Sequence, residues 1–324
     1  MDLRPFITRK EQLRTGVKFI RDGHLFYQPF ILADDVEVGE GQNLHDEYDK
    51  VTGISDFNVY APQQDVGDRK QPTDLGHFRK CNQEYREIYD YIADQICMHA
   101  GGKLSDLTFA EIGCNTGLNL FNLALRGAKS CRGYDWNDLS NLFRWMNNLL
   151  GTDVRFTRGI YDNLYHRFKD EVQVPEVDIM INTVFTNHQC DPLQFLAFLC
   201  DRARKGVFLW ALIHPGLSDP CVVYTAEMRG DILEKDKLFP LSFNNGVVIS
   251  EKLLKISLQY LGFDEVTAID KFVPSPSWDR FQEGFRMYYA RRTRDVKSAY
   301  WTPSDQKHGN RRKTFDRLRR RLWK

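Results

Sequence analysis

The stretch FAEIGCNTGLNLFNLALRGAKSCRGYDWN, residues 109–137, decides the fold. An apolar run over residues 107–112 is followed by glycines at Gly113 and Gly117. A helical pattern over residues 119–126 ends at Gly127, and a second strand pattern over residues 130–134 leads to Asp135. A strand, a glycine-containing turn, a helix and a second strand in this order predict a βαβ unit with parallel strands.

The same alternation continues on both sides of this unit. Helical spacing of apolar residues covers 78–100, 139–150, 192–204 and 250–261, and strand patterns cover 154–157, 177–183 and 206–213. Residues 265–269 and 285–291 are expected to form an antiparallel pair at the sheet edge. We therefore predict an α/β fold with a Rossmann-like, doubly wound, mostly parallel sheet.

The chain is predicted to have three parts. Residues 17–38 show short strand patterns and residues 39–77 are loop-rich, so residues 1–77 are assigned to an N-terminal extension. Residues 78–293 form the predicted α/β domain, and its insertion at about 219–246 is expected to contact substrate, the alternative being an ordinary solvated loop. Residues 294–324 form a basic C-terminal tail.

Bulk composition is typical of a globular protein, with 42% hydrophobic and 27% charged residues in a chain of 324. No apolar run reaches the roughly 18 residues of a membrane span, and the N-terminus lacks a signal-peptide core. We expect a cytoplasmic protein without a transmembrane segment. The seven cysteines contain no C-x-x-C pair, which favours reduced thiols and predicts no metal site.

Charge is concentrated at the C-terminus. Residues 311–324 hold eight Lys/Arg and one Asp, a net +7, so residues 1–310 carry −6 of the chain's total of +1. The acidic body disfavours a surface for a nucleic-acid backbone. The tail reads as a basic amphipathic helix that could lie on an anionic membrane, touch RNA or dock on the acidic body, the alternative being a frayed terminus.

The turn after the first strand favours a nucleoside cofactor without phosphate. A dinucleotide requires G-x-G-x-x-G, whereas this loop reads G-x-x-x-G with Asn115 in place of a third glycine. Asn tolerates the left-handed backbone that such a loop requires. Glu111 before the loop suits a cation, and Asp135, twenty-two residues after Gly113, can accept both ribose hydroxyls.

These motifs resemble the class I S-adenosylmethionine-dependent methyltransferases. EIGCNTG resembles the first motif of that family, and GCNTG…RGAKSCRGYD resembles a subgroup that includes the tRNA wobble-uridine carboxymethyltransferases and uncharacterised relatives. GIYDNL (159–164) and VDIMINTVFTNHQCDP (177–192) are weaker matches. The resemblance covers roughly residues 105–270 and implies S-adenosyl-L-methionine as cofactor.

The resemblance also implies roles for individual residues. Glu111 and the loop of Gly113, Cys114, Asn115 and Gly117 would hold the methionine part, and Asp135 would hold the ribose. The remaining cofactor contacts would pack near the adenine or lie under the sulfonium; they are Trp136, Ile160, Tyr161, Asp162, Thr183 and Val184.

Methyl transfer to oxygen usually needs a general base, and two histidines are candidates. His188 follows the strand at 177–183, and His214 follows the strand at 206–213. For His188 the alternative is a loop histidine that orders backbone.

The function predicted from these observations is methylation, most simply at oxygen, of a small-molecule, glycan or lipid-linked acceptor. A tRNA-modifying methyl- or carboxymethyltransferase is the first alternative, suggested by the subgroup resemblance. A non-catalytic S-adenosylmethionine-binding protein is the second. Peripheral membrane contact through the tail would fit a lipid-linked acceptor.

Overall fold

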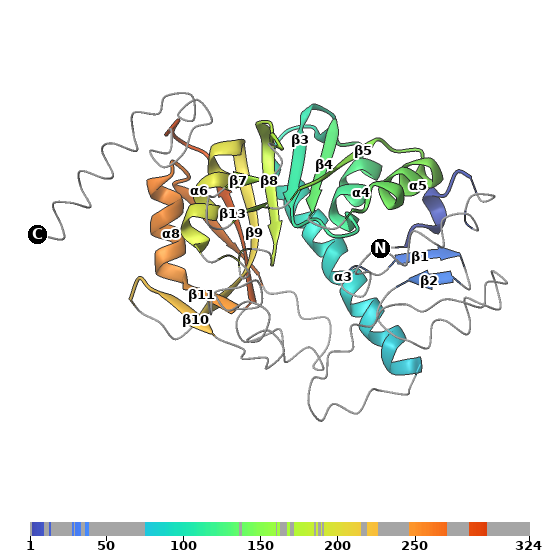
Figure 1. Ribbon diagram of the computed structural model, residues 1–324, viewed down its shortest axis with the longest axis horizontal. Helices are drawn as coiled ribbons and strands as arrows, with labels where there is room; N and C mark the ends of the chain where they lie inside the picture. The colour runs from blue at the N-terminus through green and yellow to red at the C-terminus, as the bar shows by residue number, and fades with distance from the viewer. Residues whose placement is uncertain are drawn as a thin grey trace, which may run out of the picture.

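The computed structural model describes the α/β domain and parts of the N-terminal region (Figure 1). The described residues are 2–9, 13, 28, 30–33, 36–38, 75–135, 138–159, 161–162, 167–168, 172–184, 186, 189, 191–214, 219–225, 246–270 and 285–296. The insertion between residues 226 and 245 and the tail beyond residue 296, to which the sequence assigns substrate and membrane contacts, lie outside them.

A nine-stranded sheet forms the centre of the domain. Strands pair in the order β5-β4-β3-β8-β9-β13-β12, and β11 (Gly246–Ser250) also pairs with the end of β9. These strands are β3 (Thr108–Ile112), β4 (Ser130–Asp135), β5 (Val154–Arg158), β8 (Val177–Thr183), β9 (Ala203–His214), β12 (Glu265–Ile269) and β13 (Phe285–Arg291). β3, β4, β5, β8 and β9 are mutually parallel, and β13 is antiparallel to both β9 and β12. The chain order reverses between β3 and β8, which makes the carboxyl ends of these two strands the expected ligand position.

Helices cover both faces of the sheet. One apolar cluster joins α3 (Leu75–Ala100), α4 (Leu118–Leu125) and α5 (Ser140–Leu150) to one face through residues such as Phe109, Ile179 and Phe208. A second cluster joins α6 (Pro192–Arg202) and α8 (Glu251–Tyr260) to the other face through alternate residues such as Ala110 and Met180. Because helices cover both faces of the sheet, all seven residues of β8 are buried, and the middle of this strand, residues 179–181, is continuously apolar. No helix among the described residues is long and apolar enough to cross a membrane.

The predicted fold class is confirmed: the chain has a Rossmann-like, mostly parallel sheet, with an antiparallel pair at one edge. Element boundaries shift by a few residues. The first long helix begins at residue 75 rather than 78, and Ser250, predicted as the first residue of the last helix, is its N-cap and accepts a bond from Leu253 N at 3.3 Å.

The main addition is a hairpin that the sequence patterns did not predict. Its strands, β10 (Val222–Thr225) and β11 (Gly246–Ser250), bracket the insertion, and β11 pairs with the carboxyl end of β9. A second small hairpin, β6 (Tyr161–Asp162) with β7 (Arg167–Phe168), follows β5.

The N-terminal region packs on the α/β domain at several points. A short 3-10 helix (Arg4–Phe6) precedes a hairpin of β1 (Phe30–Ala33) and β2 (Val36–Val38), which matches part of the strand pattern expected over 17–38. Leu3 and Phe30 are fully buried in the same apolar cluster as α3, α4 and α5. Thr8 N donates to Leu149 O at 2.9 Å. A division of the chain at residue 77 stays a prediction, but these contacts join the described residues on both sides of it.

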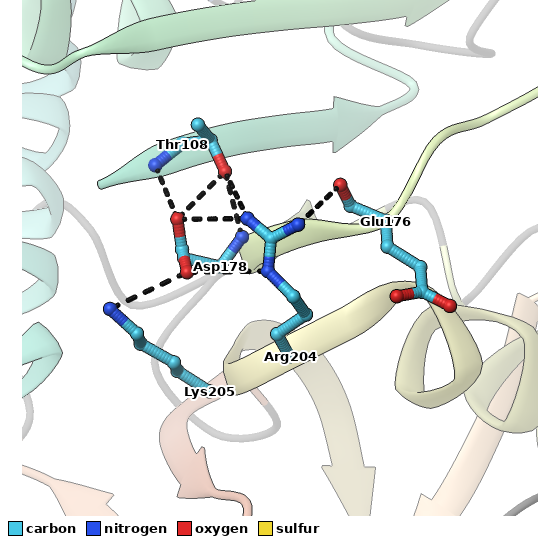
Figure 2. A network of polar contacts seen from close by, with 5 residues as sticks. All are labelled: Thr108, Glu176, Asp178, Arg204 and Lys205. Carbon is cyan, nitrogen blue, oxygen red and sulfur yellow. Dashed lines mark hydrogen bonds and ion pairs between the residues drawn. The ribbon is translucent and has the colours of Figure 1, made fainter. Parts of the chain in front are cut away.

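Polar side chains close the opposite, amino-terminal edge of the sheet (Figure 2). Thr108 begins β3, Asp178 lies near the start of β8, and Arg204 and Lys205 lie near the start of β9. The carboxylate of Asp178 accepts from Thr108 N at 2.9 Å and from Thr108 Oγ1 at 2.8 Å, and it forms ion pairs with Arg204 at 3.1 Å and Lys205 at 3.4 Å. The network ties together three neighbouring strands that are adjacent in space but distant in sequence.

Candidate functional site

The loop between β3 and α4 has an unusual backbone. Gly113, Asn115 and Gly117 all adopt left-handed conformations, with φ of 73°, 47° and 77°. At Gly117 a side chain would also collide, because a Cβ there would lie 2.4 Å from the ring of Phe143. The substitution of Asn for glycine at 115 is therefore compatible with this loop, as expected from the tolerance of Asn for left-handed geometry.

Internal hydrogen bonds hold the first half of this loop. The backbone N–H groups of Gly113 and Cys114 both donate to Tyr134 O, at 2.8 and 3.1 Å, so the loop folds back over the end of β4. Gly117 N donates to Cys114 O at 2.9 Å and closes the turn.

Side chains from outside the loop accept its other N–H groups. Asn115 N donates to Asp135 Oδ2 at 2.9 Å, and Leu118 N, the first amide of α4, donates to Gln28 Oε1 at 3.1 Å. An anion-binding loop instead presents such amides to a phosphate. Here five backbone N–H groups between residues 113 and 118 already have acceptors within the protein.

Glu111 is the buried carboxyl group of the site. Its side chain leaves the fourth position of β3 and is fully buried, and its Oε1 accepts from Asn119 Nδ2 and from Thr183 Oγ1, both at 2.8 Å. Oε2 finds no hydrogen-bond partner among the described residues, and the same is true of Asn119 Oδ1. Burial raises the pKa of Glu111 from 4.5 to about 8, although the bonds from Asn119 and Thr183 act in the opposite direction and the charge of Asp135 adds to the rise.

Asp135 lies at the end of β4, next to this loop. It is 7% exposed, and its backbone oxygen accepts from Gly159 N at 2.8 Å, which joins the ends of β4 and β5. The bond from Asn115 N occupies one of the roughly four lone-pair sites of a carboxylate. The predicted ribose contact of Asp135 stays a prediction, and this bond places its carboxylate directly against the loop.

The end of β8 completes the arrangement. Thr183 binds Glu111, and Val184 follows with φ of 67°, a rare conformation for a β-branched residue. Val184 N donates to Trp210 O at 2.7 Å, which holds this backbone in place. Strained backbone of this kind concentrates at functional sites. The structure therefore brings Glu111, Thr183 and Val184 to the same edge of the sheet.

The side chain of Cys114 faces the core rather than the expected cofactor. It is fully buried, and a Cβ on Gly133 would lie 2.6 Å from its Sγ, so the thiol packs closely over β4. Any contact between Cys114 and a ligand would therefore use its backbone.

The structure does not describe the side chains of several predicted site residues. Trp136, Ile160 and His188 are outside the described residues. Tyr161 and Asp162 form strand β6. His214 ends β9 and pairs with Ser250 on β11. The catalytic roles of His188 and His214 remain predictions.

Two buried residues of the site, Asn119 and Gln28, were not among the predicted residues. Asn119 is fully buried, and it and Asn122 are the two polar residues of the otherwise apolar helix α4, a signal that could have pointed to both. Gln28 lies 90 residues before its partner Leu118, and no local sequence pattern indicates such a contact. Asp191, within the weaker match at 177–192, is the N-cap of α6 and accepts from Gln194 N at 3.0 Å.

Comparisons with known proteins give similarities at the level of overall structure only. No protein-family model matches the sequence, and no curated protein matches it. The magnesium protoporphyrin IX methyltransferase of Synechocystis PCC 6803, solved with bound SAH, aligns with a TM-score of 0.43 and 16% identity over 70% of this chain and 90% of that chain.

Two further structures align over a similar region. The N-terminal domain of EvdMO1 with SAH bound gives a TM-score of 0.44 and 14% identity over 63% of this chain and 80% of that chain. An S-adenosylmethionine-dependent methyltransferase from Mesorhizobium loti gives a TM-score of 0.39 and 12% identity over 63% of this chain and 100% of that chain. These alignments are weak, so the fold is assigned from the strand order of this chain.

Proposed function

We propose that this protein is an S-adenosylmethionine-dependent methyltransferase. The observation that carries the proposal is the loop after β3, whose amides are occupied by acceptors of the protein and which lies between two buried carboxyl groups, Glu111 and Asp135. A pyrophosphate would meet few available donors and an unfavourable charge there. A nucleoside cofactor that carries cationic groups in place of phosphates fits this chemistry.

The residues present suit the cationic part of such a cofactor. Glu111 Oε2 and Asn119 Oδ1 are buried acceptors without partners among the described residues, and leaving such atoms unsatisfied costs about 1–3 kcal/mol each. The amino group of a methionine moiety would supply the missing donors, directly or through one ordered water. Asp135, at the end of the next strand, would accept from the ribose hydroxyls.

Bound S-adenosylmethionine would supply an electrophilic methyl group on a sulfonium. The protein's own part would be to hold the acceptor oxygen close to this methyl group and in a fixed orientation. The hydroxyl proton of the acceptor would pass to a base, for which His188 and His214 are the candidates. Thr183 and Val184 would shape the edge of the sheet beneath the methyl group.

For the acceptor we propose a small molecule, a glycan or a lipid-linked compound, methylated at oxygen. The net charge of −6 on residues 1–310 supports an acceptor without a phosphate backbone. The C-terminal tail would then contact an anionic membrane. A tRNA substrate, the alternative drawn from the subgroup resemblance, predicts tRNA binding with a steep salt dependence.

Calorimetric titration with S-adenosylmethionine and SAH tests the cofactor. We expect the native protein to bind both, and Asp135→Ala to weaken binding at least about tenfold, the loss of one or more hydrogen bonds to a charged group. The matched control is Asp153→Asn, a surface carboxylate with an 86% exposed side chain, which should bind normally. No binding by the native protein would refute the cofactor proposal.

Transfer of labelled methyl groups to fractionated cell extract then separates the functions. Label in a small-molecule, glycan or lipid fraction supports the proposed acceptor class, and label in tRNA supports the alternative. Cofactor binding without transfer to any fraction would favour a non-catalytic binding protein.

A further inference from the structure

Gln28 lies two residues before β1, and its side chain reaches the loop after β3. It is only 2% exposed, although the sequence assigns it to an extension outside the α/β domain. Nε2 donates to Cys114 O at 3.2 Å and to Tyr89 OH at 3.4 Å, and Oε1 accepts from Thr116 Oγ1 at 2.7 Å and from Leu118 N at 3.1 Å. Both donors and both lone pairs of the amide are therefore used.

Three of these four bonds go to alternate residues of the loop, at positions 114, 116 and 118. The loop needs such support because its left-handed residues make it costly to hold in one conformation. The amino-terminal end of α4 also needs acceptors for its first backbone N–H groups. The N-cap residue is Gly117, which has no side chain to accept from the first amides of the helix. Gln28 provides that acceptor from another part of the chain.

The segment that carries Gln28 is itself anchored in the core. Phe30, two residues later, is 1% exposed, and Leu3 N donates to Ile31 O at 2.9 Å. A flexible glutamine side chain loses considerable entropy when it is fixed, so a firmly held backbone is needed for it to act as a clamp.

A second contact connects Gln28 to the end of β8. Tyr89 on α3, which accepts from Gln28, lies edge-to-face on Trp210 with ring centroids 6.4 Å apart. The backbone oxygen of Trp210 accepts from Val184 N. One packed group thus joins the N-terminal segment and α3 to both strand ends of the candidate site.

We propose that Gln28 is a positioning residue for cofactor binding, which makes the N-terminal segment a part of the cofactor site rather than an appendage. Gln28 fixes the loop after β3 in its ligand-binding conformation before the ligand arrives. The identity of the ligand rests on the proposed function, whereas the effect of Gln28 on the loop does not.

The test compares Gln28→Met, which keeps the volume of the side chain and removes its polar atoms, with the native protein. We expect the Kd for SAH to rise at least about tenfold, corresponding to loss of more than one hydrogen bond. Hydrogen exchange of the Leu118 amide should also become faster. The matched control is Gln83→Met on the surface of α3, where the glutamine bonds only to Glu87 in the described structure; it should change neither quantity.

Gln28→Glu gives a second readout that a loss of packing would not produce. As a carboxylate it can accept from Leu118 N but repels Cys114 O, whereas its protonated form can donate again. The ratio of its SAH affinity to that of the native protein should therefore rise as pH falls from 8 to 5.5. The titratable side chains near this position are Tyr89, the Cys114 thiol, whose pKa is raised well above its usual value by burial, and beyond that thiol Glu111 and Asp135.

The outcomes separate the two proposals. Unchanged SAH affinity and unchanged Leu118 exchange in Gln28→Met would overturn the positioning role. Equal losses in Gln28→Met and Gln28→Glu, without pH dependence, would also overturn it and leave only packing. If the native protein fails to bind SAH while Leu118 exchange still accelerates in Gln28→Met, the positioning role stands and the cofactor proposal fails.

Discussion

Glu111 and Asp178 are buried carboxyl groups on neighbouring strands, at opposite edges of the same sheet. Asp178 accepts two bonds from Thr108 and pairs with Arg204 and Lys205. Among the described residues, Glu111 accepts bonds from two neutral groups, both on Oε1. Burial disfavours the charged form of both carboxyl groups. At Asp178 the hydrogen bonds and charges prevail and lower the pKa to about 2, whereas at Glu111 burial prevails and raises it to about 8.

Under the proposed function, the difference separates an edge of the sheet that contributes to stability from an edge that binds the ligand. At the amino-terminal edge every acceptor of Asp178 and the hydroxyl of Thr108 has a partner within the protein, so nothing remains for a ligand (Figure 2). At the carboxyl edge, Glu111 Oε2 is a buried acceptor that no described residue satisfies, at a cost in stability that a ligand with donors would recover. The three predictions below test this contrast.

The largest effect is expected for Glu111→Gln, which should weaken S-adenosylmethionine binding and stabilise the empty protein. Loss of a charge-assisted bond to the ligand predicts a Kd between about 10-fold and about 100-fold higher. In the unfolded chain Glu111 ionises near pH 4.5, but in the folded protein only near pH 8. Between pH 4.5 and about pH 8 the folded protein therefore holds a proton that the unfolded chain has lost. The free energy of unfolding falls as pH rises through this range.

Replacing Glu111 by neutral Gln removes this loss of stability. The advantage of the variant over the native protein should grow from near zero at pH 4.5 to about 4 kcal/mol at pH 8, measured by urea unfolding without ligand. The exposed Asp153→Asn serves as control. If the stability difference between the variant and the native protein is the same at pH 8 as at pH 5, the bonds within the protein already compensate for burial of the Glu111 carboxylate.

Asp178→Asn should have the opposite profile. Removing the charge-assisted bonds at the amino-terminal edge is expected to cost about 2 kcal/mol at pH 7, with little change in ligand affinity. The folded pKa of Asp178 is lowered from 3.8 to about 2, so its contribution is complete above pH 4 and is lost as pH falls towards 2. Unfolding curves of both proteins between pH 2 and pH 7 should therefore converge at the acid end. Loss of binding at pH 7 in the folded variant would contradict the separation of the two edges.

The sequence predicted the sheet far better than it predicted this contrast. Periodicity is a local property, so the strand from Val177 to Thr183 and the helix from Ser140 to Leu150 were recognisable within their own residues. Glu111 and Asp135 were found because they flank a recognisable loop. The partners of Asp178 and the contacts of Gln28 lie 26 to 90 residues away, and only the order of the strands brings them together.

Backbone geometry at the carboxyl edge was also beyond the reach of the sequence. Val favours extended strands, yet Val184 adopts a left-handed conformation held by its bond to Trp210. The β10–β11 hairpin was missed because its two strands are separated by a long insertion, so no short turn signal marked the pairing. Both features depend on tertiary contacts that override local preference.

The smallest effect concerns the strain at Val184. Alanine and glycine both remove the half-buried side chain, so a comparison of Val184→Ala with Val184→Gly cancels the loss of packing. Because φ is 67°, the glycine variant should be the more stable of the two by roughly 0.5 kcal/mol. Alanine is penalised in this left-handed conformation, and the greater freedom of glycine in the unfolded chain offsets part of that difference.

The matched pair lies at the start of β8, where Val177 is a buried strand residue without a positive φ. There the order should reverse, with alanine more stable than glycine by roughly 0.5–1 kcal/mol. Thermal and urea unfolding of the four variants measure both differences. If glycine is the less stable variant at both positions, the carboxyl edge is no more strained than the amino-terminal edge. The contrast between the edges would then rest on Glu111 and Asp178 alone.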